Sequence, residues 1–271
     1  MKKPRLKHAA LPDGRKVWCV HIHELRGVPE EIPGYWQHGV SVAPSDIVLD
    51  VGANVGLFAL DAAARGAQVH AFEPMPATFA ALQANSRSFE GKEGRIETHN
   101  LALGEAPQTA QFTYFPHLSA ISTRHSHAIH HNARAVVTRV FDDPSLTPRA
   151  GWFRRAPRAL RFLCVEACAR ILFSSRPVSC QIETVSRMLT QLNVERVALL
   201  KIDVEGAEWD VLQGIQAADC PRIEQIVAEV HNEDGRLEAV CNLLRERGFT
   251  VSHEPVPVAA DWDTHMVWAR R

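Results

Sequence analysis

The sequence has 271 residues, a formal net charge of −1 and an apolar content of 46%. A chain of this length suits one large α/β domain with an elaboration and is short for two full domains. The even charge balance excludes strongly basic proteins, so we expect no nucleic-acid partner and no membrane partner. The basic start at Lys2–Lys7 lacks the apolar segment of a signal peptide, and no apolar run is long enough to span a bilayer. Together these features predict a cytoplasmic protein.

Residues 1–45 form a leading segment ahead of the main domain, which we place at residues 46–271. Asp13-Gly14 is a turn signal between two runs that suit strands, and this pattern predicts a β-hairpin. Tyr35 and Trp36 stand just before the first core strand. Two interpretations of this aromatic pair stay open: it covers a bound ligand, or it fills the edge of the sheet.

The chain is organised around the stretch from Asp46 to Phe58. Ile47–Val51 is a short apolar run rich in β-branched residues, which is typical of a strand buried on both faces. A glycine turn at Gly52–Gly56 follows, and a helical pattern then continues to Arg65. Strand, glycine turn and helix are the opening unit of a nucleotide-binding doubly wound sheet.

Three residues of this turn are candidate cofactor-binding residues. Gly52 has no Cβ, so it can adopt the positive φ of a tight turn and lets a ligand approach the backbone. Asn54 belongs to the few residue types that tolerate the left-handed region. Gly56 allows the new helix to pack closely against the strand.

Two acidic residues near the turn favour one kind of ligand. Gln68–Glu73 is a second predicted strand that ends in an acid, where a carboxylate can bind the two hydroxyls of a ribose. Asp50 lies at the end of the first strand, which is a poor place to receive a pyrophosphate. These two acids favour S-adenosylmethionine, which has a ribose and an ammonium but no phosphate, over a dinucleotide such as NAD.

The alternation of strands and helices continues along the chain. A helix starts near Pro76, and a third strand at Arg95–Asn100 ends in Asn100, which we expect on the adenine side of the cofactor. Later strands are predicted at residues 178–183, 196–203, 223–230, 249–253 and 265–269, the last two as an antiparallel closing pair. The pattern predicts an α/β fold with a doubly wound, mostly parallel seven-stranded sheet.

Residues 116–178 break this rhythm, and we interpret them as a lid-like or substrate insertion. It opens with a histidine-dense run, namely His117, His125, His127, His130 and His131. No carboxylate or cysteine has metal-ligand spacing with these residues, so we expect a surface or lid segment and no metal.

A helix is predicted at Pro157–Phe173 within this insertion. Its apolar side is expected to carry Leu160, Leu163, Cys164, Ala167, Ile171 and Leu172. A basic amphipathic helix can meet a membrane or a partner protein, but we expect this one to pack on its own domain. The six scattered cysteines are expected to be reduced packing residues.

In a parallel sheet of this kind, ligands bind outside the carboxyl ends of the strands. The polar side chains expected at that edge are Asp50, Glu73, Asn100, Asp203, Glu205 and His231. His231 is the candidate general base because its intrinsic pKa lies near working pH, although a helix-capping role is the alternative. Glu205 is the first candidate to orient the imidazole, ahead of Glu229 and Asp203. We expect Glu208 and Asp210 to face solvent.

These residues resemble a known family. Asp50-Val-Gly-Ala-Asn-Val-Gly56, Phe72-Glu73-Pro74, the run Leu200–Glu208 and Val230-His231 are similar to the motifs of the FkbM family of S-adenosylmethionine-dependent methyltransferases. The resemblance covers roughly residues 35–115 and 178–271. It implies a Rossmann-like class I methyltransferase fold and, in most members, O-methylation.

A narrower resemblance concerns Tyr114-Phe-Pro, Ser122 and the run Glu229–Arg236, which look similar to the branch associated with polyketide and nonribosomal peptide synthases. That branch implies methylation of a hydroxyl on a natural-product intermediate by a histidine and a glutamate without metal. His231 matches the histidine, and Glu205 is the carry-over for the glutamate. The acceptor is then a small molecule or is tethered to a carrier protein, and a homodimer is left open. The alternatives are methylation of a sugar hydroxyl or an amine, a non-catalytic nucleoside-binding protein, and an NAD-dependent Rossmann protein.

Overall fold

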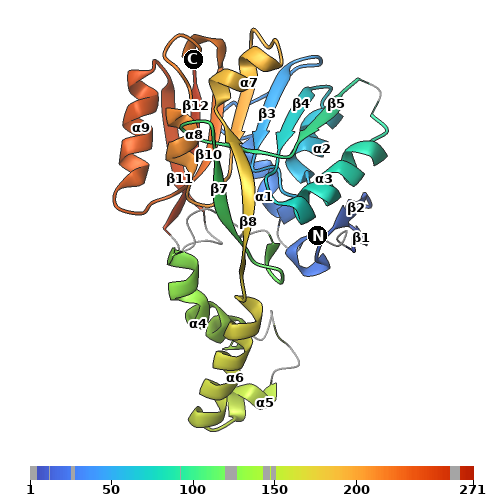
Figure 1. Ribbon diagram of the computed structural model, residues 1–271, viewed down its shortest axis with the longest axis vertical. Helices are drawn as coiled ribbons and strands as arrows, with labels where there is room; N and C mark the ends of the chain where they lie inside the picture. The colour runs from blue at the N-terminus through green and yellow to red at the C-terminus, as the bar shows by residue number, and fades with distance from the viewer. Residues whose placement is uncertain are drawn as a thin grey trace.

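The computed structural model describes residues 5–11, 13–25, 28–91, 93–119, 127–142, 147, 151–256 and 263–271. A seven-stranded sheet forms its centre (Figure 1). In spatial order its strands are β11 (Thr250–Pro255), β12 (Thr264–Arg270), β10 (Gln225–His231), β9 (Leu199–Ile202), β3 (Ile47–Val51), β4 (Gln68–Phe72) and β5 (Arg95–His99). The five strands from β10 to β5 run parallel, whereas β12 is antiparallel to both β10 and β11. The predicted doubly wound sheet with an antiparallel closing pair is confirmed.

Helices cover both faces of this sheet because its central strands are apolar on both sides. Val48 of β3 packs in one core with α1 (Val28–Tyr35), α2 (Leu57–Ala64) and α3 (Pro76–Ser88). Its neighbour Leu49 points to the opposite core, with α7 (Val185–Gln191), α8 (Glu208–Gln213) and α9 (Arg236–Glu246). This alternation follows from the two-residue period of a strand. None of the described helices is long and apolar enough to cross a membrane.

A second, three-stranded sheet was not foreseen as a separate unit. It contains β6 (Ala102–Leu103), β8 (Arg176–Glu183) and β7 (Gln108–Tyr114), in that spatial order. Strand β8 pairs in parallel with β6 and antiparallel with β7, so the strand predicted at residues 178–183 belongs to this sheet and not to the central one. We call the two sheets and the helices on the central sheet the body.

The leading segment forms part of the body. Strands β1 (Lys7–Ala10) and β2 (Lys16–Cys19) form the predicted antiparallel hairpin. Asn85 of α3 fixes this hairpin, since its side chain accepts a 2.7 Å hydrogen bond from the Trp18 N–H and donates to the Trp18 carbonyl. Tyr35 at the end of α1 is buried in the core, and Trp36 stacks on Phe58.

Three helices between β7 and β8 extend away from the body, and we call them the protrusion (Figure 1). They are α4 (His127–Asp142), α5 (Gly151–Arg155) and α6 (Arg158–Leu172). Helix α4 was not predicted, because its histidine-dense start has no clear apolar period. Its Ala133 and Val137 lie one turn apart and pack in a small core with Phe153 of α5 and Val165 and Ala169 of α6.

The predicted packing of α6 is wrong in part, since Cys164 and Leu172 of the predicted side do pack against the small core. Leu160, Leu163 and Ile171, expected on the packed side, are exposed. The helix buries Val165 and Ala169 instead, because α4 and α5 lie against that other side. The six cysteines are free thiols and are buried or half-buried, as expected for packing residues.

Candidate active site

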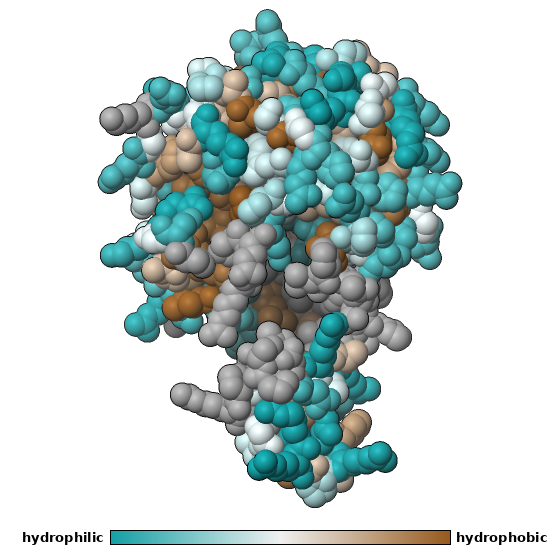
Figure 2. Space-filling model, turned by 180° about the vertical axis from the view of Figure 1, so that it is seen from behind, coloured by the Kyte–Doolittle hydropathy of each residue, from teal (hydrophilic) through white to brown (hydrophobic). Residues whose placement is uncertain are grey.

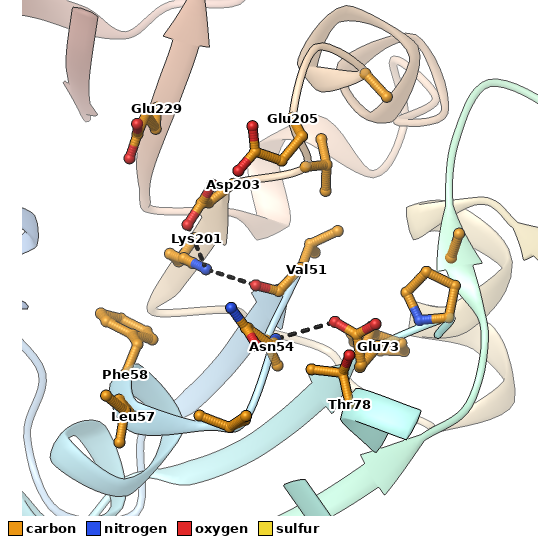
Figure 3. Close-up of a pocket in the computed structure, with 18 of the residues that line it drawn as sticks. Val51, Asn54, Leu57, Phe58, Glu73, Thr78, Lys201, Asp203, Glu205 and Glu229 are labelled. Atoms are coloured by element: carbon orange, nitrogen blue, oxygen red, sulfur yellow. Dashed lines mark hydrogen bonds and ion pairs between the residues drawn. The ribbon is translucent and has the colours of Figure 1, made fainter. Parts of the chain in front are cut away.

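A cavity of about 290 Å³ opens at the carboxyl ends of β3, β4, β9 and β10. Figure 3 shows the residues of its two sides: Asn54, Glu73 and Thr78 on one side, and Asp203, Glu205 and Glu229 on the other. This is the edge at which parallel α/β sheets bind ligands. The face of the molecule seen in Figure 2 is hollowed where the body meets the protrusion.

The glycine turn forms the floor of the cavity in the predicted conformation. Gly52 has a φ of +77°, and a Cβ added there would lie 1.7 Å from the carbonyl oxygen of Asp203. Asn54 is in the left-handed region, with a φ of 51°. Both residues line the cavity, and Gly52 has no side chain that would hold a ligand away from the backbone.

Glu73 follows strand β4 directly and presents its carboxyl group to the cavity. Its carboxylate accepts hydrogen bonds from the N–H groups of Asn54 (3.0 Å) and Met75 (2.8 Å). Burial raises the pKa of Glu73 to about 8, although these two bonds oppose the shift. The hydroxyl of Thr78 also lines the cavity and is buried without a partner among the described residues. A carboxyl and a hydroxyl are therefore available to a polar ligand.

Asp50 has a different position from the one predicted. It is fully buried, and it is not among the described residues that line the cavity. The Nζ of Lys201 lies 3.1 Å from its carboxylate and 3.4 Å from that of Asp203, and it donates a 2.9 Å hydrogen bond to the Gly52 carbonyl. Lys201 therefore connects the β3 turn to the end of β9, and Asp50 supports the cavity from beneath.

The two acids stabilise the charge of Lys201, whereas burial raises the pKa of Asp50 despite the neighbouring lysine. Burial lowers the pKa of Lys201, but Asp50 and Asp203 outweigh it and raise that pKa to about 12. The hydroxyl of Tyr35 donates a 3.0 Å hydrogen bond to Asp203. Tyr35 and Asp203 both line the cavity, which is consistent with Tyr35 as a ligand cover, whereas Trp36 stacks on Phe58 and is not among the described lining residues.

Two further predicted residues lie outside the cavity lining. The side-chain amide of Asn100 donates to the carbonyls of Glu73 (2.9 Å) and Pro74 (3.1 Å), so it holds the chain that carries Glu73. Gly56 was expected to let α2 pack on the strand, but a Cβ there would meet the Leu82 side chain of α3, at 2.5 Å. Asn100 and Gly56 therefore support the segments that carry the lining residues and do not face the cavity themselves.

On the opposite side, Glu205 lines the cavity and His231 lies behind it. Glu205 has a φ of 54°, a left-handed conformation that is uncommon for a non-glycine residue and is often found at functional sites. Its carboxylate is 3.5 Å from Nε2 of His231, while the other ring nitrogen, Nδ1, is 3.2 Å from Glu208. The structure thus brings the predicted histidine and glutamate together.

The pKa values of the pair differ from those of free side chains. Burial raises the pKa of Glu205 to about 7, with His231 opposing the shift. For His231, burial lowers the pKa, but the hydrogen bond to Glu208 and the charges of Glu205 and Glu208 outweigh it and raise the pKa to about 10. The neighbouring acids therefore favour the imidazolium form of His231, which is not among the described residues that line the cavity.

Sequence reasoning missed several residues of the site. Glu208, expected to face solvent, is fully buried and accepts a 2.7 Å hydrogen bond from the Gly206 N–H. Lys201 lies within an apolar strand and was not selected as a site residue. A single lysine in such a strand indicates a buried ion pair, because a buried charge requires a partner. Glu229 was only a secondary candidate, yet it lines the cavity.

The described residues include one group that could share a metal, and it lies away from the predicted histidine run. Nδ1 of His70 is 3.2 Å from Nε2 of His99, and Glu97 is 3.6 Å from His70. A direct imidazole–imidazole hydrogen bond accounts for this contact. Of the histidine run, His117 is exposed and His125 lies outside the described residues.

Comparison with known proteins agrees with this geometry. The family model described as "Methyltransferase FkbM domain" matches residues 50–251. The chain is 35% identical over 266 residues to the 31-O-demethyl-FK506 methyltransferase FkbM of Streptomyces tacrolimicus, and the match covers 96% of this chain and 95% of that protein. It is 32% identical to the AMB antimetabolite synthetase AmbE of Pseudomonas aeruginosa, with 96% of this chain matching 12% of that much longer protein.

Among solved structures, the methyltransferase FkbM of Methylobacillus flagellatus superposes with a TM-score of 0.50 at 14% identity, covering 90% of this chain and 51% of that one. At this identity the likeness concerns the fold alone. The family match, by contrast, covers the cavity residues from Val51 to Glu229. The chain therefore belongs to the FkbM methyltransferase family and is a methyltransferase with the Rossmann-like class I fold.

Proposed function

We propose that this methyltransferase uses S-adenosylmethionine to methylate a hydroxyl group of a natural-product intermediate. One observation carries the proposal: a single cavity has Glu73 on one side and Glu205 on the other, and His231 contacts Glu205 from behind. Glu73 suits the binding of a nucleoside, and Glu205 suits the removal of a proton from the acceptor. The printed name of the Streptomyces relative describes an O-demethyl acceptor, which supports a hydroxyl as the acceptor here.

The residues present fit this cofactor. A carboxylate can accept hydrogen bonds from the two hydroxyl groups of a ribose. Glu73 has only two N–H donors, which do not offset its burial, so its pKa is raised and further donors would stabilise its ionised form. The unpartnered hydroxyl of Thr78 lies in the same cavity. Gly52 also lines the cavity, and a Cβ there would collide with the Asp203 carbonyl, so the turn requires glycine at this position.

The cofactor supplies an electrophilic methyl group, which leaves two tasks to the protein. It must align the acceptor, and it must take the proton that the acceptor oxygen loses as the new bond forms. We assign proton removal to Glu205, because its carboxylate lines the cavity and its pKa of about 7 leaves it largely ionised slightly above neutral pH.

His231 then acts as a positioning residue. Its imidazolium is held by Glu208 on one side and faces Glu205 on the other, so its charge favours the ionised form of Glu205. This assignment exchanges the two roles expected from the sequence, where His231 was the base. The exchange follows from the position of Glu205 in the cavity lining and from the charge on His231.

The test is the pH dependence of turnover in the wild type and two variants. S-adenosylhomocysteine formation would be followed with hydroxylated polyketides and peptides, both free and as carrier-protein thioesters. A base must be deprotonated, so turnover of the wild type should rise with pH and reach half its maximum at about 7. Glu205→Gln should lose about 100-fold to 10,000-fold in turnover. Glu105→Gln, an exposed glutamate on the body, is the matched control and should be unchanged.

The variant His231→Gln separates the two role assignments. If His231 supports Glu205, the variant keeps a pH-dependent rise, but shifted to higher pH because the neighbouring positive charge is gone. If turnover disappears in His231→Gln and persists in Glu205→Gln, the histidine is the base and our assignment fails. Cofactor binding without turnover of any hydroxyl, sugar or amine acceptor would contradict the proposed reaction itself.

A further inference from the structure

The protrusion exposes most of the large apolar side chains that lie on the surface of the described part of the chain. Seven large apolar side chains are exposed among the described residues. All of them except Ile22 belong to α4, α5 or α6. The six on the protrusion are Val140, Trp152 (56% exposed), Leu160, Phe162 (61%), Leu163 (63%) and Ile171. Exposed apolar residues concentrated in this way mark an interaction surface.

The same three helices carry a strong positive charge. Their sequences contain seven arginines, no lysine and two acidic residues, which gives a net charge of +5 with neutral histidines. Both acids are already paired, Asp142 with Arg161, and Glu166 with Arg134 and Arg170. Arg155 and Arg158 are exposed and have no partner among the described residues. The near-zero charge of the whole chain conceals this local excess.

The exposed apolar residues point in several directions at one end of α6. Leu160 and Phe162 are two positions apart, so their side chains leave the helix about 160° from each other. Both are exposed, as is Leu163 between them. Trp152 of the neighbouring helix α5 adds a further large side chain, and α5 lies at the end of the protrusion away from the body (Figure 1). Hydrophilic residues cover much of the rest of the protrusion (Figure 2).

We propose that the end of the protrusion docks on the surface of an anionic lipid membrane. A bilayer interface can surround a helix end that is apolar on opposite sides, whereas a rigid protein surface covers one side only. Tryptophan, phenylalanine and leucine beside arginines are typical of interfacial binding. A second copy of this chain would bring arginines against arginines, which disfavours self-association. The inference does not depend on the proposed methyl transfer.

The test is co-sedimentation of the full chain with vesicles at about 0.1 M salt. Vesicles of equal parts phosphatidylcholine and phosphatidylglycerol should bind the protein, and pure phosphatidylcholine should bind it at least tenfold less. The triple variant Leu160→Ser, Phe162→Ser, Leu163→Ser should weaken binding about 100-fold, while Ile22→Ser, which removes the exposed apolar residue outside the protrusion, should not. Circular dichroism and thermal unfolding would check that each variant is folded.

The charges can be tested separately. Arg155→Gln with Arg158→Gln should weaken vesicle binding about tenfold to thirtyfold, compared with no change for the matched pair Arg95→Gln and Lys16→Gln on the body. Absence of binding to the anionic vesicles would overturn the proposal, and so would binding that the triple variant leaves intact. A dimer in solution that the triple variant converts to a monomer would assign the surface to self-association instead. Vesicle binding is measured independently of cofactor binding and turnover. A negative result here is therefore distinguishable from failure of the proposed reaction.

Discussion

The body and the protrusion use apolar side chains in opposite ways. In the body, both faces of the central sheet are covered, and residues such as Leu49, Val51 and Val48 have essentially no exposure. In the protrusion, the three helices bury one side against each other, around Val137, Phe153 and Val165, and leave large side chains on the outside. A sheet with helices on both faces completes its own core, whereas three helices that pack only against each other leave their outer sides uncovered. Stability should therefore depend on the body, and the protrusion is available for contacts with other molecules.

The largest effect is expected at the buried ion pair of the body. Lys201→Met leaves Asp50 buried without its cation, which should lower the free energy of unfolding by about 3–5 kcal/mol. The double variant Lys201→Met with Asp50→Leu removes both charges and should recover much of that loss. Arg158→Met on the protrusion should change stability by less than about 0.5 kcal/mol. Urea unfolding of the four proteins measures this, and a Lys201→Met protein as stable as the wild type would contradict it.

A matched pair of leucines compares the two regions directly. Leu212→Ala in the body removes a fully buried side chain and should cost about 2–5 kcal/mol in unfolding free energy. Leu163→Ala on the protrusion shortens a side chain that is 63% exposed and should cost less than about 0.5 kcal/mol. Chemical denaturation gives both values. Similar losses in the two variants would mean that the outside of the protrusion is buried in solution.

A smaller effect is expected from a methyl group in the glycine turn. Gly52 and Gly235 have nearly equal positive φ, +77° and +78°, so alanine is equally strained in the backbone at both. Only at Gly52 would the Cβ collide, with the Asp203 carbonyl. Gly52→Ala should therefore cost about 1–3 kcal/mol more than Gly235→Ala, and it should also weaken cofactor binding. Equal thermal shifts in the two variants would show that the turn adapts without cost.

The sequence was informative where local chemistry decides the structure. The strand at Ile47–Val51, the positive φ of Gly52 and Asn54, and the acid at Glu73 all depend on residues within a few positions of each other. The position of His231 depends instead on Glu208, which is 23 residues away in the chain and on another element. Its charge, and therefore its role, could not be read from its neighbours.

Helix α6 illustrates a second limit. Its sequence has two apolar sides, one with Leu160, Leu163 and Ile171 and one with Val165, Ala169 and Leu172. Helical period alone does not indicate which side packs, and α4, which decides it, was not predicted. The same reasoning applies to β8, whose residues read correctly as a strand but whose sheet is decided by its pairing with β6 and β7.

The most direct test of the central claim is a calorimetric titration of the wild type with S-adenosylhomocysteine and, separately, with NAD. Glu73→Gln and the exposed control Glu105→Gln would be titrated beside it, with thermal unfolding to confirm that each is folded. We predict micromolar binding of S-adenosylhomocysteine to the wild type and the control, about 10-fold to 100-fold weaker binding to Glu73→Gln, and negligible binding of NAD. No binding of S-adenosylhomocysteine, or tighter binding of NAD, would contradict the assignment of this cavity as the cofactor site.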